Sequence, residues 1–410
     1  MATATPGLRH ERSQAPLRVA ICGAGIAGPT LAYWLQRGGH RPTLIEQAPH
    51  LRQGGYLIDF WGVGYEVAQR MGLEPILQDI GYQVQRVRLV DRRGRTAASF
   101  SAGVFRDLAQ GRYVSLTRGN LAAAIYNSIV PQVETIFENS VAAIAEHDHG
   151  VQVAFTRCAP REFDLLIGAD GLHSTVRELV FGPEPQFERD LGYVVAACEV
   201  AGYRPREELV YVSYTIPGKQ IARFALRDDR TLFLFIFAAE HLPGPAPHTL
   251  AERKQALRRV FGDAGWECAR LLDAVDDVPE IYFDRVSQIR MPEWSQGRVM
   301  LIGDAAACVS LLAGEGTGLA MTEAYVLAGE LHRAQGDYQA AFRQHEQRLR
   351  PFIAGKQESA LRFAASFVPR TRFAVWRRNQ ATRLLAIAPL ANYVFARSFR
   401  DDFTLPDYGL

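Results

Sequence analysis

The chain has 410 residues, of which 48% are hydrophobic, so it is long enough to bury a large core and to form two domains. Its formal net charge of +2 gives no overall attraction to nucleic acid, and no apolar run reaches the roughly 18–20 residues of a membrane-spanning helix. The first fifteen residues lack the apolar core of a signal peptide, and five scattered cysteines form no C-x-x-C pair. These features predict a cytoplasmic protein without a disulfide framework or a metal site.

The first predicted elements form a dinucleotide-binding unit. A strand over 19–22 leads directly into Gly23-x-Gly25-x-x-Gly28, and a helix is expected from Pro29 to Arg37. Glycines at this spacing allow a tight turn, let the backbone approach a pyrophosphate, and let the helix pack close to the strand. The helix N-terminus then points its amides and dipole at the phosphates.

A second strand, over 41–46, ends in Glu46, which lies 18 residues after Gly28. A carboxylate at this point can bind the two hydroxyl groups of a ribose. Strand, turn, helix, strand and terminal acid together make a dinucleotide site a stronger prediction than the glycines alone.

The next element in the chain is a predicted hairpin over 87–97, with its turn at 91–94. From about residue 186 to 290 the chain is expected to form strands rich in aromatic residues. Phe233, Phe235 and Phe237 alternate there with other large apolar residues. This pattern predicts a sheet that is buried on both faces, or one whose second face covers a hydrophobic ligand.

Two more segments repeat the strand–turn–helix pattern. A short buried strand over 165–167 precedes Asp170-Gly171, and Ser174 can cap the helix that follows. A strand ending at Gly303-Asp304 is followed by a long helix expected from about Gly316 to Arg333. Either segment alone would fit any α/β domain.

The three motifs, in this order over about 280 residues, resemble those of the single-component FAD-dependent monooxygenases with the fold of para-hydroxybenzoate hydroxylase. The chain is most similar to the branch of tetracycline-inactivating monooxygenases and aromatic polyketide tailoring oxygenases. That branch has a Gly-Gly-x-x-x-Asp segment, here 54–59, and an Arg-x-x-Leu helix start, here 118–121.

The resemblance implies an α/β fold in three parts. These are a discontinuous Rossmann-like FAD domain, a substrate domain built on a mixed β-sheet, and a helical C-terminal segment. The expected boundaries are 16–80, 100–182 and 285–335 for the FAD domain, 81–99 and 183–284 for the substrate domain, and 336–410 for the C-terminal segment.

The resemblance also implies which residues bind FAD. Asp304 would face the ribityl and pyrophosphate groups, Arg118 would hold phosphate or ribityl oxygens, and Arg177 would stabilise the turn at Asp170. Arg52 is either a residue near the flavin ring or a solvated loop arginine. The full set of expected cofactor residues is Gly23, Gly25, Ala27, Gly28, Glu46, Arg52, Asp59, Arg118, Asp170, Gly303, Asp304 and Gly316.

The activity implied is hydroxylation of a hydrophobic, polyketide-like aromatic molecule through a flavin C4a-hydroperoxide, with NADPH or NADH as electron donor. Oxygen transfer itself needs no acid–base pair, so the sequence does not identify a catalytic side chain. Many relatives have a histidine and a proline pair where this chain has Ala307 and Ser310-Leu311. Candidate substrate residues, for each of which core packing is the competing explanation, are Tyr211, Tyr214, Arg223 and Phe235.

Two alternatives remain open from the sequence: a flavin-dependent dehydrogenase or reductase of a natural product, and a non-catalytic flavoprotein that binds a hydrophobic ligand. The pattern does not separate hydroxylation from epoxidation or Baeyer–Villiger oxidation, nor a monomer from a homodimer.

The last predicted element is a basic helix. Residues 359–400 contain eight arginines and no acid, and Phe373, Trp376, Leu384 and Ile387 fall near one helical face. Such a segment could contact an anionic membrane or pack on the protein. Because the overall charge is nearly balanced, we expect it to pack on the FAD domain and not to contact a membrane.

Overall fold

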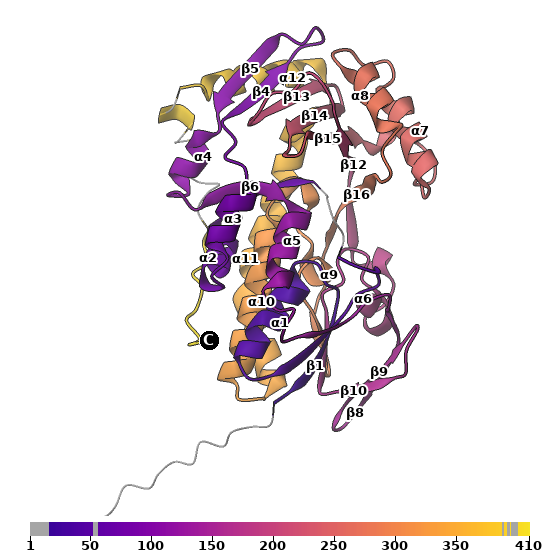
Figure 1. The fold of residues 1–410 in the computed structure, drawn as a ribbon, viewed down its shortest axis with the longest axis vertical. Coiled ribbons are helices and arrows are strands. Elements are labelled where there is room, and N and C mark those ends of the chain that lie inside the picture. Colours follow the sequence, from indigo (N-terminus) through magenta and orange to yellow (C-terminus); the bar gives the residue numbers. More distant parts are fainter. Residues whose placement is uncertain (1–15, 52–55, 388, 392–393, 395–400) are drawn as a thin grey trace, which may run out of the picture.

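The computed structural model describes residues 16–51, 56–387, 389–391, 394 and 401–410 (Figure 1). The fold is α/β with several sheets and a helical C-terminal region, as predicted. Arg52, Gly54 and Gly55 lie outside the described residues.

The part that carries the glycine motif is built on a six-stranded sheet. Its strands are β1 (Arg18–Cys22), β2 (Arg41–Ile45), β7 (Glu134–Ile136), β11 (Leu165–Gly168), β17 (Ser295–Gln296) and β18 (Val299–Leu301). They lie in the order β17-β18-β11-β1-β2-β7, and all neighbours are parallel except β17 and β18. β1 is central and its Val19, Ala20 and Ile21 have no exposed surface, which explains its unbroken apolar sequence.

Helices and two small sheets surround this core. The helices are α1 (Ala27–Arg37), α2 (Gly62–Arg70), α3 (Glu74–Ile80), α4 (Gly103–Leu108), α5 (Arg118–Asn127), α6 (Thr175–Val180), α9 (Asp304–Ala307) and α10 (Gly316–Arg333). The small sheets pair β3 (Leu57–Trp61) with β6 (Tyr113–Thr117), and β8 (Val141–His147) with β9 (Gly150–Phe155) and β10 (Arg161–Phe163). The long helix predicted from about Gly316 to Arg333 is confirmed as α10.

A seven-stranded mixed sheet forms the second part of the molecule. Its strands are β4 (Arg86–Val90), β5 (Thr96–Ser101), β12 (Glu188–Ala201), β13 (Val210–Ile216), β14 (Lys219–Ala225), β15 (Arg230–Ala238) and β16 (Tyr282–Ile289), in the order β16-β12-β15-β14-β13-β4-β5. Only β4 and β13 pair in parallel. The predicted hairpin is therefore confirmed as β4 and β5. Strands of this sheet extend to Ser101 and Ile289, a few residues beyond the boundaries expected for the substrate domain.

Both faces of the sheet are apolar, which fits either of the two predicted arrangements. Its outer face packs against α7 (Leu250–Phe261) and α8 (Cys268–Val275), and Phe233, Phe235 and Phe237 lie there without exposed surface. The intervening Leu232, Leu234 and Ile236 belong to clusters on the inner face.

The C-terminal helix α11 (Tyr338–Phe367) extends from the part with the six-stranded sheet to the part with the seven-stranded one, where α12 (Arg372–Leu384) lies (Figure 1). α11 has 30 residues and is about 45 Å long, and α12 follows it. α12 packs against β5 and β13, so the expectation that it would pack on the FAD domain was wrong. In the described part of the chain, no helix has both the length and the apolar character needed to cross a bilayer.

The last ten residues return to the glycine-motif part of the fold. Tyr408 Oη donates to Glu330 Oε1 at 2.7 Å, and Arg70 Nη1 donates to the carbonyl of Pro406 at 2.8 Å. The ring of Tyr408 lies so close to Gly329 in α10 that a Cβ there would come within 2.1 Å of it. The C-terminal end is therefore held by a site that only glycine permits.

Gly329→Ala should lower the free energy of unfolding by about 1–3 kcal/mol, because its methyl group would push the Tyr408 ring out of place. The matched control is Gly355→Ala, at an exposed position of α11 with no atom within 4 Å of the added Cβ. That change should be neutral or stabilise by up to about 1 kcal/mol, because alanine favours the helix. Urea unfolding of both variants measures the difference, and equal effects would contradict the proposed contact.

Candidate functional site

The glycine motif forms a turn in which two positions cannot carry a side chain. Gly23 has φ +102°, and a Cβ on it would lie 2.4 Å from the carbonyl oxygen of Ala169. A Cβ on Gly28 would lie 2.0 Å from the carbonyl oxygen of Gly23. Gly25 differs, because the nearest atom of the described residues to its Cβ position, chain neighbours aside, is Arg118 Nη2, at 3.5 Å. The open side of Gly25 and the N-terminus of α1 thus form a cradle beside a guanidinium group.

Glu46 stands at the end of β2 and faces this turn. Its Oε2 accepts a hydrogen bond from Ala24 N at 2.8 Å, and its Oε1 accepts one from Ala48 N at 2.9 Å. The carboxylate is therefore fixed against the motif, where a ribose would lie in a dinucleotide fold.

The third motif lies next to the first. Gly303 has φ +63°, and a Cβ there would lie 3.3 Å from Ala27 Cβ in α1. A Cβ on Gly316, at the start of α10, would lie 3.6 Å from Asp304 Oδ1. These contacts bring together four of the residues that the resemblance assigned to FAD binding, although they are almost 290 residues apart in the sequence.

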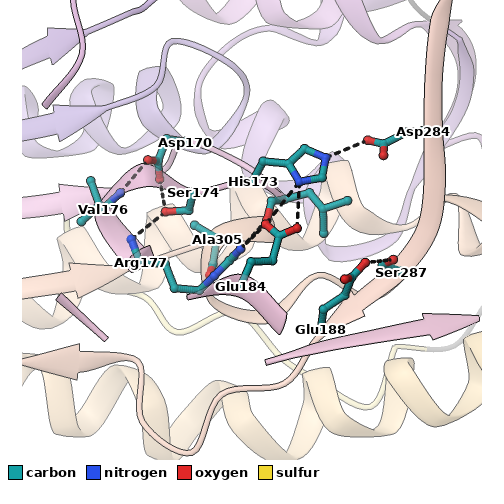
Figure 2. A network of polar contacts seen from close by, with 11 residues as sticks. Asp170, His173, Ser174, Val176, Arg177, Glu184, Glu188, Asp284, Ser287 and Ala305 are labelled. Atoms are coloured by element: carbon teal, nitrogen blue, oxygen red, sulfur yellow. Dashed lines mark hydrogen bonds and ion pairs between the residues drawn. The ribbon is translucent and has the colours of Figure 1, made fainter. Parts of the chain in front are cut away.

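The turn at Asp170 is held by a polar network (Figure 2). Asp170 accepts hydrogen bonds from Ser174 Oγ and from Val176 N. Arg177 is fully buried and donates to the carbonyl oxygens of Leu172 (2.6 Å) and Ala305 (3.1 Å). Arg177 thus ties this turn to α9, in agreement with its predicted stabilising role.

His173 extends the network to the seven-stranded sheet (Figure 2). Its Nδ1 lies 3.0 Å from Glu184 Oε1, and its Nε2 lies 3.3 Å from Asp284 Oδ2 in β16. The hydrogen bond to Asp284, followed by the charges of both acids, raises the pKa of His173 to about 9. The stabilisation is therefore fully present below the ordinary histidine value of 6.5 and is lost as the pH rises through about 9. Because the side chain is 62% exposed, its effect is screened by solvent.

Asp59 lies at a small, open hollow that Gly314, Glu315 and Lys356 also line. The carboxylate accepts hydrogen bonds from Tyr113 Oη at 2.6 Å and from a serine hydroxyl of the same strand, β6. Lys356 Nζ lies 3.0 Å from Glu315 Oε2. Two hydroxyl groups thus hold the Asp59 carboxylate in place.

The four candidate substrate residues lie on opposite faces of the sheet. Tyr211 packs on the inner face, whereas Tyr214 and Phe235 pack against α7 and α8 on the outer face. Arg223 is also on the outer side, 1% exposed and paired with Glu207 at 3.0 Å. The sequence prediction that grouped these four residues at one cavity was wrong, because alternating strand residues face opposite sides.

Two tyrosines that were not predicted as site residues lie where the sheet meets the three motifs. The ring centroids of Tyr56 and Tyr282 are 5.6 Å apart. Burial, opposed by the charge of Arg118 and assisted by that of Asp304, raises the pKa of Tyr56 to about 12. Burial, Tyr56 and Asp284 raise the pKa of Tyr282 as well. Tyr56 stands inside the Gly-Gly-x-x-x-Asp segment, but nothing in the sequence marks Tyr282.

A family model described as FAD binding domain matches residues 16–339, well over half of the chain. The chain belongs to this FAD-binding family. The predicted resemblance is confirmed, and the named relatives are flavin-dependent monooxygenases. One from Legionella longbeachae serogroup 1 (strain NSW150) is 30% identical over 403 residues, which cover 96% of this chain and 98% of the relative. Another, from an unknown prokaryotic organism, is 33% identical over 356 residues, which cover 86% of this chain and 90% of the relative.

Several solved structures have a fold similar to that of this FAD-binding protein. The tetracycline destructase Tet(55) superposes with a TM-score of 0.81 at 29% identity, and the match covers 96% of this chain and 99% of that one. HpxO of Klebsiella pneumoniae, solved with FAD and uric acid, superposes with a TM-score of 0.78 at 23% identity, over 93% of this chain and 96% of that one.

Glu323 of the FAD-binding protein is a buried acid that supports the third motif. It is 2% exposed, and its Oε2 accepts a hydrogen bond from Gly303 N at 2.8 Å. Burial, the largest influence, raises the pKa of Glu323 from 4.5 to about 8. Because its pKa is raised in the folded state, the contribution of Glu323 to stability is most favourable below pH 4.5 and falls as the pH rises toward 8.

Glu323→Gln should remove this loss, because the amide keeps an oxygen for Gly303 N and carries no charge. We expect the variant to unfold at a higher temperature than the parent near pH 8 and at a similar temperature near pH 4.5. The control is Glu330→Gln in the same helix, whose carboxylate pairs with Arg348 at 2.7 Å and should lose stability instead. A Glu323→Gln protein less stable than the parent at pH 8 would contradict the assignment.

Proposed function

We propose that the chain binds FAD and uses NADPH or NADH to insert one oxygen atom into a hydrophobic aromatic molecule of polyketide type. The observation that supports the proposal most directly is that Tyr56 and Tyr282 lie near Arg118 and Asp304. The two tyrosines thereby place an aromatic surface beside the cofactor motifs. A flavin that reaches this point would have its reactive ring at the inner face of the seven-stranded sheet.

The residues present fit FAD. Gly25 and the α1 amides would take the pyrophosphate, with Arg118 supplying positive charge, and Glu46 would take the ribose. Asp304 would accept hydrogen bonds from ribityl hydroxyls. The remaining expected residues keep the binding loops in place: Gly23, Ala27, Gly28, Asp170, Gly303 and Gly316. Asp59 would act from the hollow beside Gly314.

Bound FAD would supply the redox chemistry, which is hydride uptake from the nicotinamide and activation of oxygen. The protein would bind the substrate against Tyr56, Tyr211 and Tyr282, orient its ring, and keep water away from the reacting atoms. No described side chain is needed as an acid or a base for this step.

The substrate class is supported by two observations. The inner face of the sheet is aromatic and aliphatic, with Tyr211, Phe224, Leu234 and Tyr282 in one cluster. Tet(55), which is similar over 96% of the chain, is named a tetracycline destructase, and tetracyclines are polycyclic polyketides. The cytoplasmic location, the choice of nicotinamide and the oligomeric state remain predictions.

Asp304→Ala should raise the Kd for FAD about tenfold to a hundredfold, because a hydrogen bond to a charged group contributes about 1.5–3 kcal/mol. The control is Asp402→Ala, an exposed acid outside the candidate site, which should leave the Kd unchanged. Titration of the apoprotein with FAD, followed by flavin fluorescence, measures both values. Unchanged affinity in Asp304→Ala would contradict the proposed cofactor site.

The reaction can be tested by mixing the flavin-loaded protein anaerobically with NADPH or NADH, with and without a tetracycline, and then admitting air. Loss of the yellow flavin colour followed by a product one oxygen atom heavier would support the monooxygenase. Loss of colour without an oxygenated product would support the reductase. A flavin that stays oxidised with every ligand and both nicotinamides would favour the non-catalytic binder.

A further inference from the structure

The outward face of α12 is apolar. Phe373 is 67% exposed, Trp376 56%, Leu384 53% and Ile387, in the turn after the helix, 55%. The Phe373 and Trp376 rings stack on each other with centroids 5.8 Å apart. Among the exposed large apolar side chains of the described residues, five of eight lie between Phe373 and Val394. The exposure is thus concentrated on one helix and the segment after it.

The inward face of the same helix is mixed, with the half-buried Val375 beside polar residues. Arg378 Nη1 donates to Gln220 Oε1 at 3.2 Å and to the carbonyl of Phe367 at 3.3 Å, and burial lowers the pKa of Arg378 to about 10. Thr382 is 8% exposed. A surface helix ordinarily buries its apolar side and exposes its polar side. In α12 the larger apolar side chains instead face outward, so they do not serve to attach the helix to its own protein.

The charged side chains of α12 itself are all positive. Arg372 and Arg377 are exposed beside Phe373 and Trp376, whereas Arg383 Nε donates to the carbonyl of Ala97 in β5 at 2.6 Å. No acidic residue occurs anywhere from Ser359 to Arg400. Aromatic and aliphatic side chains flanked by arginines are typical of helices that lie in the headgroup region of an anionic bilayer.

We infer that α12 docks the protein reversibly on an anionic lipid surface. Phe373, Trp376, Leu384 and Ile387 enter the boundary between headgroups and acyl chains. The exposed Arg372 and Arg377 bind the lipid phosphates. The helix lies on the bilayer and does not cross it.

Charge also distinguishes a lipid surface from a second copy of the chain. A two-fold interface on this face would place the arginines of both copies together, and the segment has no acid to pair with them. An anionic lipid surface satisfies the apolar and the positive groups at once.

The test is sedimentation of the flavin-loaded protein with vesicles at physiological salt, using phosphatidylcholine alone or mixed with phosphatidylglycerol. We expect binding to the mixed vesicles, at least about tenfold weaker binding to the neutral ones, and weakening as salt is raised. The double variant Phe373→Ser/Trp376→Ser should lose at least about tenfold in binding to the mixed vesicles, while keeping the FAD content and melting temperature of the parent.

The matched control is Ile76→Ser/Leu179→Ser, which removes two exposed apolar side chains on other helices, 41% and 44% exposed. Its vesicle binding should equal that of the parent. Arg372→Gln/Arg377→Gln should reduce binding to the mixed vesicles and leave the weak binding to neutral ones unchanged. Absence of vesicle binding by the parent, or equal binding by the Phe373/Trp376 variant, would overturn the inference. A parent that is a dimer in solution and becomes a monomer in that variant would assign the face to a second copy instead.

Discussion

Contact between two backbones at Gly23 determines where every other part of the candidate site lies. The carbonyl of Ala169 occupies the space that a Cβ on Gly23 would fill, and the carbonyl of Gly23 does the same to Gly28. These contacts let β1 and β11 end side by side and bring the turn at Asp170 against the glycine motif. A side chain at either glycine would separate the strand ends and displace α1, the helix that supplies the phosphate cradle.

The same close packing explains why the motifs converge. α10 starts beside Asp304 and packs on α1 and α2, and a Cβ on Gly64 would lie 2.2 Å from Gly318 Cα. Small residues at these crossings allow the helix backbones to approach closely. Arg177 and Glu323, both buried, then hold the two remaining turns through hydrogen bonds to the backbone. The site is therefore positioned mainly by backbone contacts, and its polar side chains remain available for a ligand.

The parts that the sequence predicted correctly are those with a local signal. The spacing of Gly23, Gly25 and Gly28, the terminal Glu46 and the cap at Ser174 each follow from short-range chemistry, and the structure has them where expected. Both faces of the seven-stranded sheet are apolar, so alternation could not indicate which of Tyr211 and Tyr214 faces the motifs. Tyr282 becomes important only through its position beside Tyr56, a contact over more than 220 residues that no local pattern encodes.

The connectivity of the six-stranded sheet determines the order in which its strands can pair during synthesis. β1 pairs with β11, which is over 140 residues further along, and β11 pairs with β18, about 130 residues beyond that. The ribosome releases these strands one after another, so β1 and β2 have unpaired edges until their neighbours β11 and β7 have emerged. The six-stranded sheet is therefore complete only after β18 has left the ribosome, whereas the hairpin β4–β5 can pair as soon as its own two strands have emerged.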